Sequence, residues 1–295
     1  MKVIFSLLFL PIFAIGQTTF TGSIFNKNTN AVVPYATIGL MIENIGVNAD
    51  ENGDFILNSR RSKLNDTVIV SSIGFITQKI AVTNKLASNL NIQLVEQIPT
   101  LEEIIIIPNY KWTKTALNEF SDCGNHFITS SGYLQQLAQH FVSPKANAGL
   151  TKVKICRMTG SIFDPLRTIL RIRVYDIDTL TGGPGKDLCD KIIEIKSKNN
   201  SIDVDVEEYK IKFPHKDFFV ALEWLKISYN EQKIAHKING NDTMLIVYTP
   251  SIGLKDLNDS ELEAWQLTYS QIWRPLSYSY QGQKKYIAIS VIINY

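Results

Sequence analysis

Apolar and polar residues alternate with a period of two along most of the chain, and this alternation predicts β-strands. The clearest example spans residues 169–176, where Arg171 and Arg173 alternate with three aliphatic side chains. Two arginines on one face predict that this face meets water while the aliphatic face packs into a core. Residues 202–207 alternate in the same way, with acidic side chains on the polar face.

Short segments rich in β-branched and aromatic residues follow one another through the first third of the chain, separated by turn residues. Asp50-Glu51-Asn52-Gly53 is typical of a tight hairpin turn, in which the glycine adopts a positive φ. A turn is favoured over a calcium loop at Asp50, Asn52 and Asp54, because the later glutamate of such a loop is missing. The expected strands are 21–25, 35–42, 54–57, 67–72, 78–82 and 90–94.

Five motifs lie in these segments: Gly22-Ser23-Ile24, Pro34-Tyr35-Ala36-Thr37-Ile38, Asp50-Glu51-Asn52-Gly53-Asp54-Phe55, Asp66-Thr67-Val68-Ile69-Val70-Ser71-Ser72-Ile73-Gly74-Phe75 and Ile92-Gln93-Leu94. In this order they resemble the carboxypeptidase-like regulatory domain family, a transthyretin-like β-sandwich. The resemblance implies a domain that accompanies peptidases and transporters without carrying their chemistry. One departure is Asn48-Ala49, where the family often has a threonine, and it affects a turn only.

The segment Leu101 to Ile107 resembles the one that ends this regulatory domain in bacterial outer-membrane transporters, where a plug and a barrel follow. Fewer than two hundred residues remain in this chain, whereas such a barrel needs about 22 strands of about ten residues each. We therefore expect a protein other than such a transporter. Pro108-Asn109 marks a boundary, because proline ends the extended segment. We expect one domain over residues 17–107 and a second over residues 109–295.

The second region is predicted to be a larger jelly-roll-like β-sandwich of about nine strands with long loops, so the whole chain is expected to be all-β. Residues 133–141 fit both an amphipathic helix and a strand, and the surrounding β pattern favours a strand. A short helix is expected at Ser260 to Ala264, capped by Asp259 or Ser260. Further expected strands are 152–158, 191–196, 218–227, 243–249, 265–273 and 286–293.

Two further motifs, Arg173-Val174-Tyr175-Asp176 and Pro184-Gly185-Lys186-Asp187-Leu188, lie in this second region. They resemble the C-terminal region of Bacteroidetes-type envelope proteins that carry the same regulatory domain. The resemblance implies an architecture and no activity.

The first sixteen residues have the features of a secretory signal peptide. Lys2 precedes an apolar run, and Ala14-Ile15-Gly16 places small residues where a signal peptidase recognises them. A membrane anchor is less well supported, because the run contains Pro11 and is shorter than the about twenty residues needed to cross a bilayer. We expect cleavage before Gln17 and export to the periplasm, the outer-membrane surface or the medium, with no transmembrane segment after cleavage.

The composition is that of a globular protein, with 295 residues, 45% hydrophobic and 20% charged. Collagen, coiled coil and extensive disorder are excluded on this basis. The 30 basic and 28 acidic side chains leave a formal charge of +2. This near balance gives no broad electrostatic footprint for nucleic acid, so no nucleic-acid partner is expected.

The cysteines Cys123, Cys156 and Cys189 are spaced 33 residues apart, but their flanking residues share no repeat. In an exported chain an odd number leaves at least one unpaired. None belongs to a Cys-x-x-Cys pair, so a metal or redox site is not expected. We interpret them as buried structural thiols and leave open whether any two form a disulfide.

Candidate catalytic groups are sparse. The four histidines, His126, His140, His215 and His236, lack His-Glu-x-x-His spacing, and neither a Gly-x-Ser-x-Gly nor a glycine-rich phosphate motif occurs. We therefore expect no catalytic residue, no metal site, no cofactor and no enzymatic activity. A hydrolase whose site is assembled from distant residues is the least favoured alternative.

Two groups of side chains are candidates for binding. Asp176, Asp178 and Asp187 flank a loop and could hold calcium, although solvated loop acids are the preferred interpretation. If residues 265–273 form one strand, Trp265 and Trp273 share a face with Tyr269 that could bind sugar or peptide, although core packing is favoured. Trp224 is expected in the core.

The sequence identifies no binding residue with a specific motif. It predicts a non-enzymatic exported protein of the cell envelope that acts as a binding or structural accessory with a protein or glycan partner. The alternative is a carbohydrate- or peptide-binding module in the C-terminal sandwich.

Overall fold

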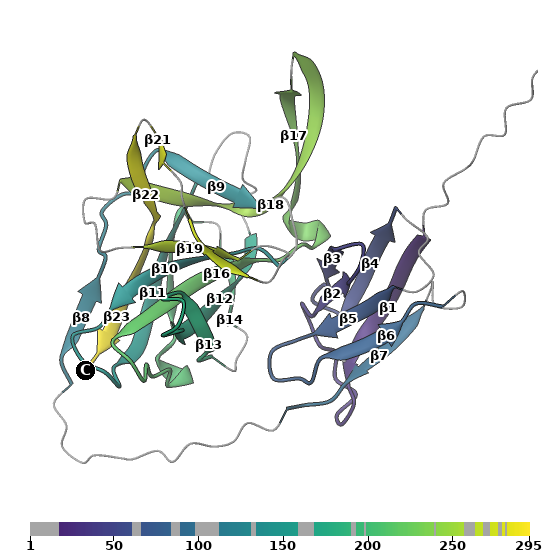
Figure 1. Ribbon diagram of the computed structural model, residues 1–295, viewed down its shortest axis with the longest axis horizontal. Helices are drawn as coiled ribbons and strands as arrows, with labels where there is room; N and C mark the ends of the chain where they lie inside the picture. The colour runs from purple at the N-terminus through teal and green to yellow at the C-terminus, as the bar shows by residue number, and fades with distance from the viewer. Residues whose placement is uncertain are drawn as a thin grey trace, which may run out of the picture.

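The computed structural model describes residues 18–60, 66–83, 89–97, 112–130, 134–158, 168–189, 193–197, 199–238, 240–256, 263–267, 272–276, 279–280 and 282–295. The chain is almost entirely β-strand, which confirms the predicted fold class, and Figure 1 shows two bodies of strands. The predicted signal peptide and the predicted boundary at Pro108-Asn109 lie outside the described residues and stay predictions. None of the described helices is long and apolar enough to cross a membrane.

The N-terminal sandwich comprises residues 18–97 and packs two sheets around an aliphatic core that includes Ile24, Ile38 and Val70. The three-stranded sheet has the order β4 (Asp54–Ser59), β1 (Thr18–Asn26) and β7 (Leu90–Leu94). The four-stranded sheet has the order β3 (Ile45–Asn48), β2 (Thr37–Leu40), β5 (Thr67–Ser71) and β6 (Gln78–Ala81).

Two motifs of the sequence have direct structural reasons in this sandwich. Gly22 lies opposite Leu90 in the parallel β1–β7 pair, where a Cβ would collide with the Leu90 carbonyl oxygen. In the turn before β4, the Asp50 carboxylate accepts the backbone N–H groups of Asn52 at 2.8 Å and Asp54 at 3.0 Å, and Gly53 has a φ of 78°. The predicted tight turn is confirmed, but it is not a hairpin, because β3 pairs with β2 in one sheet whereas β4 pairs with β1 in the other.

The C-terminal sandwich comprises residues 112–295 and packs a seven-stranded sheet against a nine-stranded sheet. In the first, the order is β13 (Pro184–Asp187), β12 (Thr168–Ile177), β16 (Asp217–Trp224), β10 (Gln136–Val142), β19 (Ala264–Leu267) and β20 (Trp273–Pro275), and β14 (Ile193–Ser197) also pairs with β12. In the second, the order is β21 (Ser279–Tyr280), β22 (Gln283–Ile287), β18 (Asn241–Asp256), β11 (Gly149–Met158), β23 (Ile289–Asn294) and β8 (Lys114–Leu117). Three more strands pair off this path, β15 (Ser201–Asp205) with β11, and β17 (Glu231–Ile238) and β9 (His126–Ser130) with β18.

Several predicted elements can now be compared with the structure. Residues 136–142 form strand β10, so the preference for a strand over a helix is confirmed. The expected single strand over 265–273 is wrong, because β19 and β20 pair antiparallel, with Leu267 opposite Trp273. The C-terminal sandwich has more strands than the nine expected, since short edge strands such as β8 and β13 lack a clear alternation. The helix expected from Ser260 lies largely outside the described residues, and Ala264 begins β19.

The two sandwiches are joined by a compact contact. Tyr35 of the N-terminal sandwich packs in an apolar cluster with Ile169, Leu225 and Ile227 of the C-terminal sandwich. Beside this cluster, Asn48 donates its backbone N–H to the Lys226 carbonyl at 3.1 Å, and its side-chain oxygen accepts the Lys226 N–H at 2.8 Å. Burial raises the pKa of Tyr35 to about 12, so its hydroxyl stays protonated in this contact.

Candidate functional site

The polar face of β12 is buried, contrary to the expectation that it meets water. The side chain of Arg171 is only 2% exposed. It donates to the Glu223 carboxylate at 3.0 Å and to the Tyr35 carbonyl at 2.8 Å. The expectation was wrong because strand β16 supplies a buried carboxylate and the N-terminal sandwich covers the end of this face.

Glu223 lies between two guanidinium groups. Its second oxygen accepts from Arg173 at 2.9 Å, and Arg173 also binds Asp187. Burial alone would raise the pKa of Glu223, but the positive charges of Arg171 and Arg173 outweigh it and hold that pKa below its usual value. This network links three strands of one sheet to the N-terminal sandwich, and within it the Nε atom of Arg171 is buried without a hydrogen-bond partner.

Trp265 is not available to the aromatic platform that the sequence suggested. Trp265 is buried, and its ring lies edge-on to Phe219 with the ring centroids 6.4 Å apart. Trp273 is half-buried and lies edge-on to Tyr175 at 5.4 Å. Tyr269 lies outside the described residues. Trp224 is in the core, as predicted, and donates its indole N–H to the Pro250 carbonyl at 2.7 Å.

The three aspartates proposed for calcium bind different partners. Asp176 pairs with His215 at 3.0 Å, and Asp187 accepts from Arg173 at 2.9 Å. Asp178 accepts the Leu180 backbone N–H at 3.0 Å within its own turn. The structure thus does not bring them together, and the described residues contain no group of three side chains suited to hold a metal ion.

The histidines are also dispersed. His140 on β10 pairs with Asp217 at the start of β16, with Nε2 2.9 Å from the carboxylate, while His215 pairs with Asp176. His126 begins β9, and His236 lies in β17. Each imidazole for which a partner is described has one carboxylate, which is a common structural pairing.

A groove of the C-terminal sandwich lies on the outer face of the nine-stranded sheet, away from the aromatic side chains that the sequence singled out. It is a groove of about 370 Å³, within the range of small-ligand sites. Its floor consists of outward side chains of three paired strands, because the alternate residues on β11 and β23 face the core. These floor residues are Lys152 and Lys154 on β11, Ser290 and Ile292 on β23, and Asp203 on β15.

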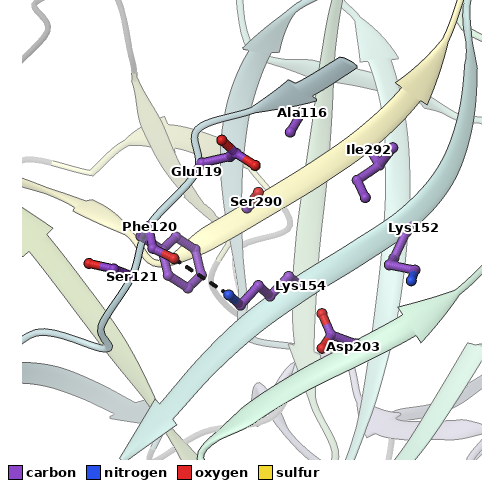
Figure 2. A pocket seen from close by; sticks show the side chains of 9 residues that line it. All are labelled: Ala116, Glu119, Phe120, Ser121, Lys152, Lys154, Asp203, Ser290 and Ile292. Atoms are coloured by element: carbon purple, nitrogen blue, oxygen red, sulfur yellow. Dashed lines mark hydrogen bonds between the residues drawn. The ribbon is translucent and has the colours of Figure 1, made fainter. Parts of the chain in front are cut away.

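The wall of the groove is formed by the end of β8 and the segment after it, which we call the wall loop (residues 118–125). Glu119 and Phe120 face the groove, as Figure 2 shows, and Ser121 also lines it. The loop is fixed to the sheet by a disulfide between Cys123 and Cys156 of β11. The sequence left open whether any two cysteines pair, and the structure pairs Cys123 with Cys156, so these two are not thiols, whereas Cys189 is buried and forms no disulfide.

Other contacts fix the wall loop at both ends. The Asn118 side chain donates to the Ile289 carbonyl at 2.7 Å. The Asp122 carboxylate binds Lys255, and this bond lowers the pKa of Asp122. Lys154 donates to the Phe120 carbonyl at 3.4 Å, the dashed line in Figure 2, and its ammonium lies 5.1 Å from the Phe120 ring centroid. A wall held in this way is ordered before any ligand arrives.

The groove combines several kinds of hydrogen-bonding group with apolar surface. Lys152 provides an ammonium donor, Ser290 and Ser121 provide hydroxyls, and Glu119 and Asp203 provide carboxylate acceptors. The ring of Phe120 and the side chains of Ala116 and Ile292 provide the apolar part. This combination suits a polyhydroxylated ligand that also presents C–H surface.

Sequence reasoning missed this groove because it lacks a motif. Lys152 and Lys154 show only the alternation of a half-exposed strand, and Ser290 is more than a hundred residues away in the chain. The one available signal was the outward face of β11, whose charges imply contact with water. The pairing of Cys123 with Cys156, which brings the wall to the floor, could not be deduced from spacing.

A second groove of about 330 Å³ lies on the other side of the wall loop, between Asp122 and Lys285. Tyr286 and His126 also line it. A third, of about 400 Å³, lies on the outer face of the β3-β2-β5-β6 sheet and includes Leu134 of the C-terminal sandwich. It is lined mainly by small or aliphatic residues such as Gly39 and Ile69.

Comparison with known proteins identifies the N-terminal part. Residues 20–106 match the CarboxypepD_reg-like domain, so the chain carries such a domain, as the sequence motifs implied. No curated protein matches the chain. Among solved structures, a protein proposed to bind carbohydrate, from Bacteroides uniformis, is 8% identical over 79% of this chain and 96% of that chain, with a TM-score of 0.23.

Proposed function

We propose that this protein is an exported, non-enzymatic binding accessory of the cell envelope, and that its C-terminal sandwich binds a saccharide in the groove beneath the wall loop. The observation that carries the proposal is the groove itself. Its floor and wall are tied by the Cys123–Cys156 disulfide, and its lining offers donors, acceptors and a phenyl ring. Such a pre-ordered site loses little conformational entropy when a ligand binds.

Export is supported by two independent features. Residues 1–16 have the pattern of a signal peptide. The disulfide fits the same location, because disulfides persist in the periplasm and outside the cell and are rare in a reducing cytosol.

The non-enzymatic part of the proposal is supported by the placement of the ionisable groups. The His140–Asp217 and His215–Asp176 pairs line none of the three grooves described above, and His126, which lines the second groove, is outside the groove proposed to bind the saccharide. The CarboxypepD_reg-like domain would then act as a neighbour that holds the binding sandwich, in line with the accessory role implied by the family.

The test is a glycan array probed with the chain from residue 17 to 295, followed by calorimetric titration of the strongest oligosaccharide. We expect Lys152→Ala to weaken binding at least about tenfold, since loss of one charged hydrogen bond costs about 1.5–3 kcal/mol. Lys212→Ala is the matched control, because Lys212 is exposed on the same sandwich but outside the groove. Absence of any glycan binding, or equal affinity of the Lys152→Ala variant, would overturn the proposal. Hydrolysis of a bound oligosaccharide would overturn its non-enzymatic part.

A further inference from the structure

The hairpin of β17 and the first part of β18 projects from the C-terminal sandwich as a two-stranded ribbon (Figure 1). We call residues 231–238 and 241–247 the arm. From Asn241 to Val247, β17 is the only strand of the described residues that pairs with β18. Strand β9 joins β18 from Tyr248 onward, on the edge opposite β17. The β9-side edge of residues 241–247 is therefore unpaired within the described part of the chain.

Three consecutive apolar side chains are exposed on this part of β18. Met244 is 59% exposed, Leu245 36% and Ile246 46%. A two-stranded ribbon is of marginal stability alone, and an exposed apolar strand edge is a template for pairing with another chain. The arm is thus an interaction surface, and its apolar side chains lie on β18, where the unpaired edge is.

The polarity of the tip argues against insertion into a membrane. Gly240, Asn241 and Asp242 form the end of the arm, and Asp242 lies 3.9 Å from Lys237 in an ion pair. End-on insertion would bury these polar groups before Met244 reached the apolar layer, which is costly. The apolar side chains are instead placed to meet a strand that lies alongside β18.

We propose that the occupant of this edge is a second copy of the chain, which pairs its own β18 antiparallel across a two-fold axis centred on Leu245. In this register Met244 lies opposite Ile246 of the second copy, and Thr243 lies opposite Val247. Residues 243–247 contain no charged side chain, so this pairing places no like charges opposite each other. The two arms together form a four-stranded sheet. Because the axis is two-fold, both copies use the same strand edge, so the assembly ends at a dimer.

This inference does not depend on the proposed binding function, because no arm residue lines the groove beneath the wall loop. The first test is sedimentation analysis of the chain from residue 17 to 295 over a range of concentrations. We expect a reversible dimer, and Met244→Lys should raise its dissociation constant at least tenfold by placing a charge at the pairing edge. Met41→Lys is the matched control, since Met41 is equally exposed, at 59%, on the N-terminal sandwich.

The second test fixes the register. Leu245→Cys should form a disulfide-linked dimer under mild oxidation, because residue 245 faces its own copy at the axis, at a spacing that a disulfide can span. Thr243→Cys should not, since it faces residue 247 of the second copy. A wild-type chain that is monomeric at every concentration overturns the inference. A dimer that persists in Met244→Lys also overturns the inference. So does crosslinking through Thr243→Cys and not through Leu245→Cys. Binding of a different protein to the arm, without self-association, is the fourth contradicting result.

Discussion

Glu223 neutralises two guanidinium groups, those of Arg171 and Arg173, inside the protein. Glu223→Gln would leave Arg171 buried without its counter-charge, so we expect a loss of about 3–5 kcal/mol in unfolding free energy. Urea denaturation of the wild type and the variant measures this loss. Glu51→Gln is the control, since Glu51 makes an exposed ion pair with Lys196 at the same contact between sandwiches. We expect that change to cost under about 1 kcal/mol, and similar losses for both variants would contradict this role of Glu223.

The lowered pKa of Glu223 also predicts a pH dependence. In the unfolded chain this carboxyl titrates near its ordinary value of 4.5, and in the folded chain it titrates lower. Its contribution to stability is therefore complete above pH 4.5 and is lost as the pH falls through the folded pKa. Denaturation curves between pH 7 and about pH 3 should show the loss. The Glu223→Gln variant should show a shallower dependence, and an unchanged slope would argue against the assignment.

Arg171 shows what the alternation of residues can and cannot predict. The pattern correctly separates the aliphatic face of β12 from its arginine face. It gives no information about what lies over the second face, because the carboxylate comes from β16 and the carbonyl from Tyr35, 136 residues earlier. The arginines predict an exposed face because burying an unpaired charge costs free energy. The groups that pair with these arginines and remove this cost are distant in the sequence.

The turn between β12 and β13 closes over the buried ring of Trp265. A Cβ at Gly183 would lie 2.6 Å from Cζ3 of this ring, so Gly183→Ala requires the turn or the ring to move. We expect a loss of about 1–3 kcal/mol in unfolding free energy. The wavelength of maximum Trp emission should also change, because the surroundings of the Trp265 ring change. Leu180→Ala in the same turn is the control, because Leu180 is 94% exposed and should change neither quantity. Wild-type stability of Gly183→Ala would show that this packing is loose.

The Cys123–Cys156 disulfide closes a segment with a sequence separation of 33 residues. Replacing both cysteines by serine should lower the unfolding free energy by about 3–4 kcal/mol on the chain-entropy estimate. The same variant should weaken ligand binding, because the wall loop loses its covalent attachment. Alkylation of the unfolded, unreduced chain followed by mass spectrometry is a direct check and should label Cys189 alone. Labelling of all three cysteines would show that the disulfide is absent.

At the level of elements, the sequence predicted long internal strands better than edges and pairings. Residues 169–176 and 152–158 have continuous alternation and form β12 and β11. In the segment 265–273, a single strand would place Trp265, Tyr269 and Trp273 on one face, because their spacing satisfies a period of two. The structure places these residues on paired strands, so the same spacing arises from a hairpin. The groove was missed for a related reason, since its floor joins strands β11, β15 and β23.

The motifs of the regulatory domain predicted the N-terminal sandwich but gave no sign of how it docks. The docking contact is specific in structure: Asn48 satisfies both backbone groups of Lys226, and Arg171 reaches the Tyr35 carbonyl. Asn48 is also the first residue of Asn48-Ala49, the pair at which the sequence departs from the family. The departure was interpreted as a change in a turn, whereas in the structure it supplies the bond between the two sandwiches.

This contact predicts that the two sandwiches unfold together. Their shared cluster and hydrogen bonds are lost when either sandwich unfolds, so each stabilises the other. Calorimetry of residues 17–295 should show one transition, and Asn48→Ala should separate this transition into two by leaving the partly buried Lys226 N–H unsatisfied. Asn58→Ala, at an exposed position on β4, is the control and should keep one transition. Two transitions in the wild type would mean that the sandwiches are thermodynamically independent. The groove and the arm would then have to be explained from the C-terminal sandwich alone, because no stabilisation would pass to it from the regulatory domain.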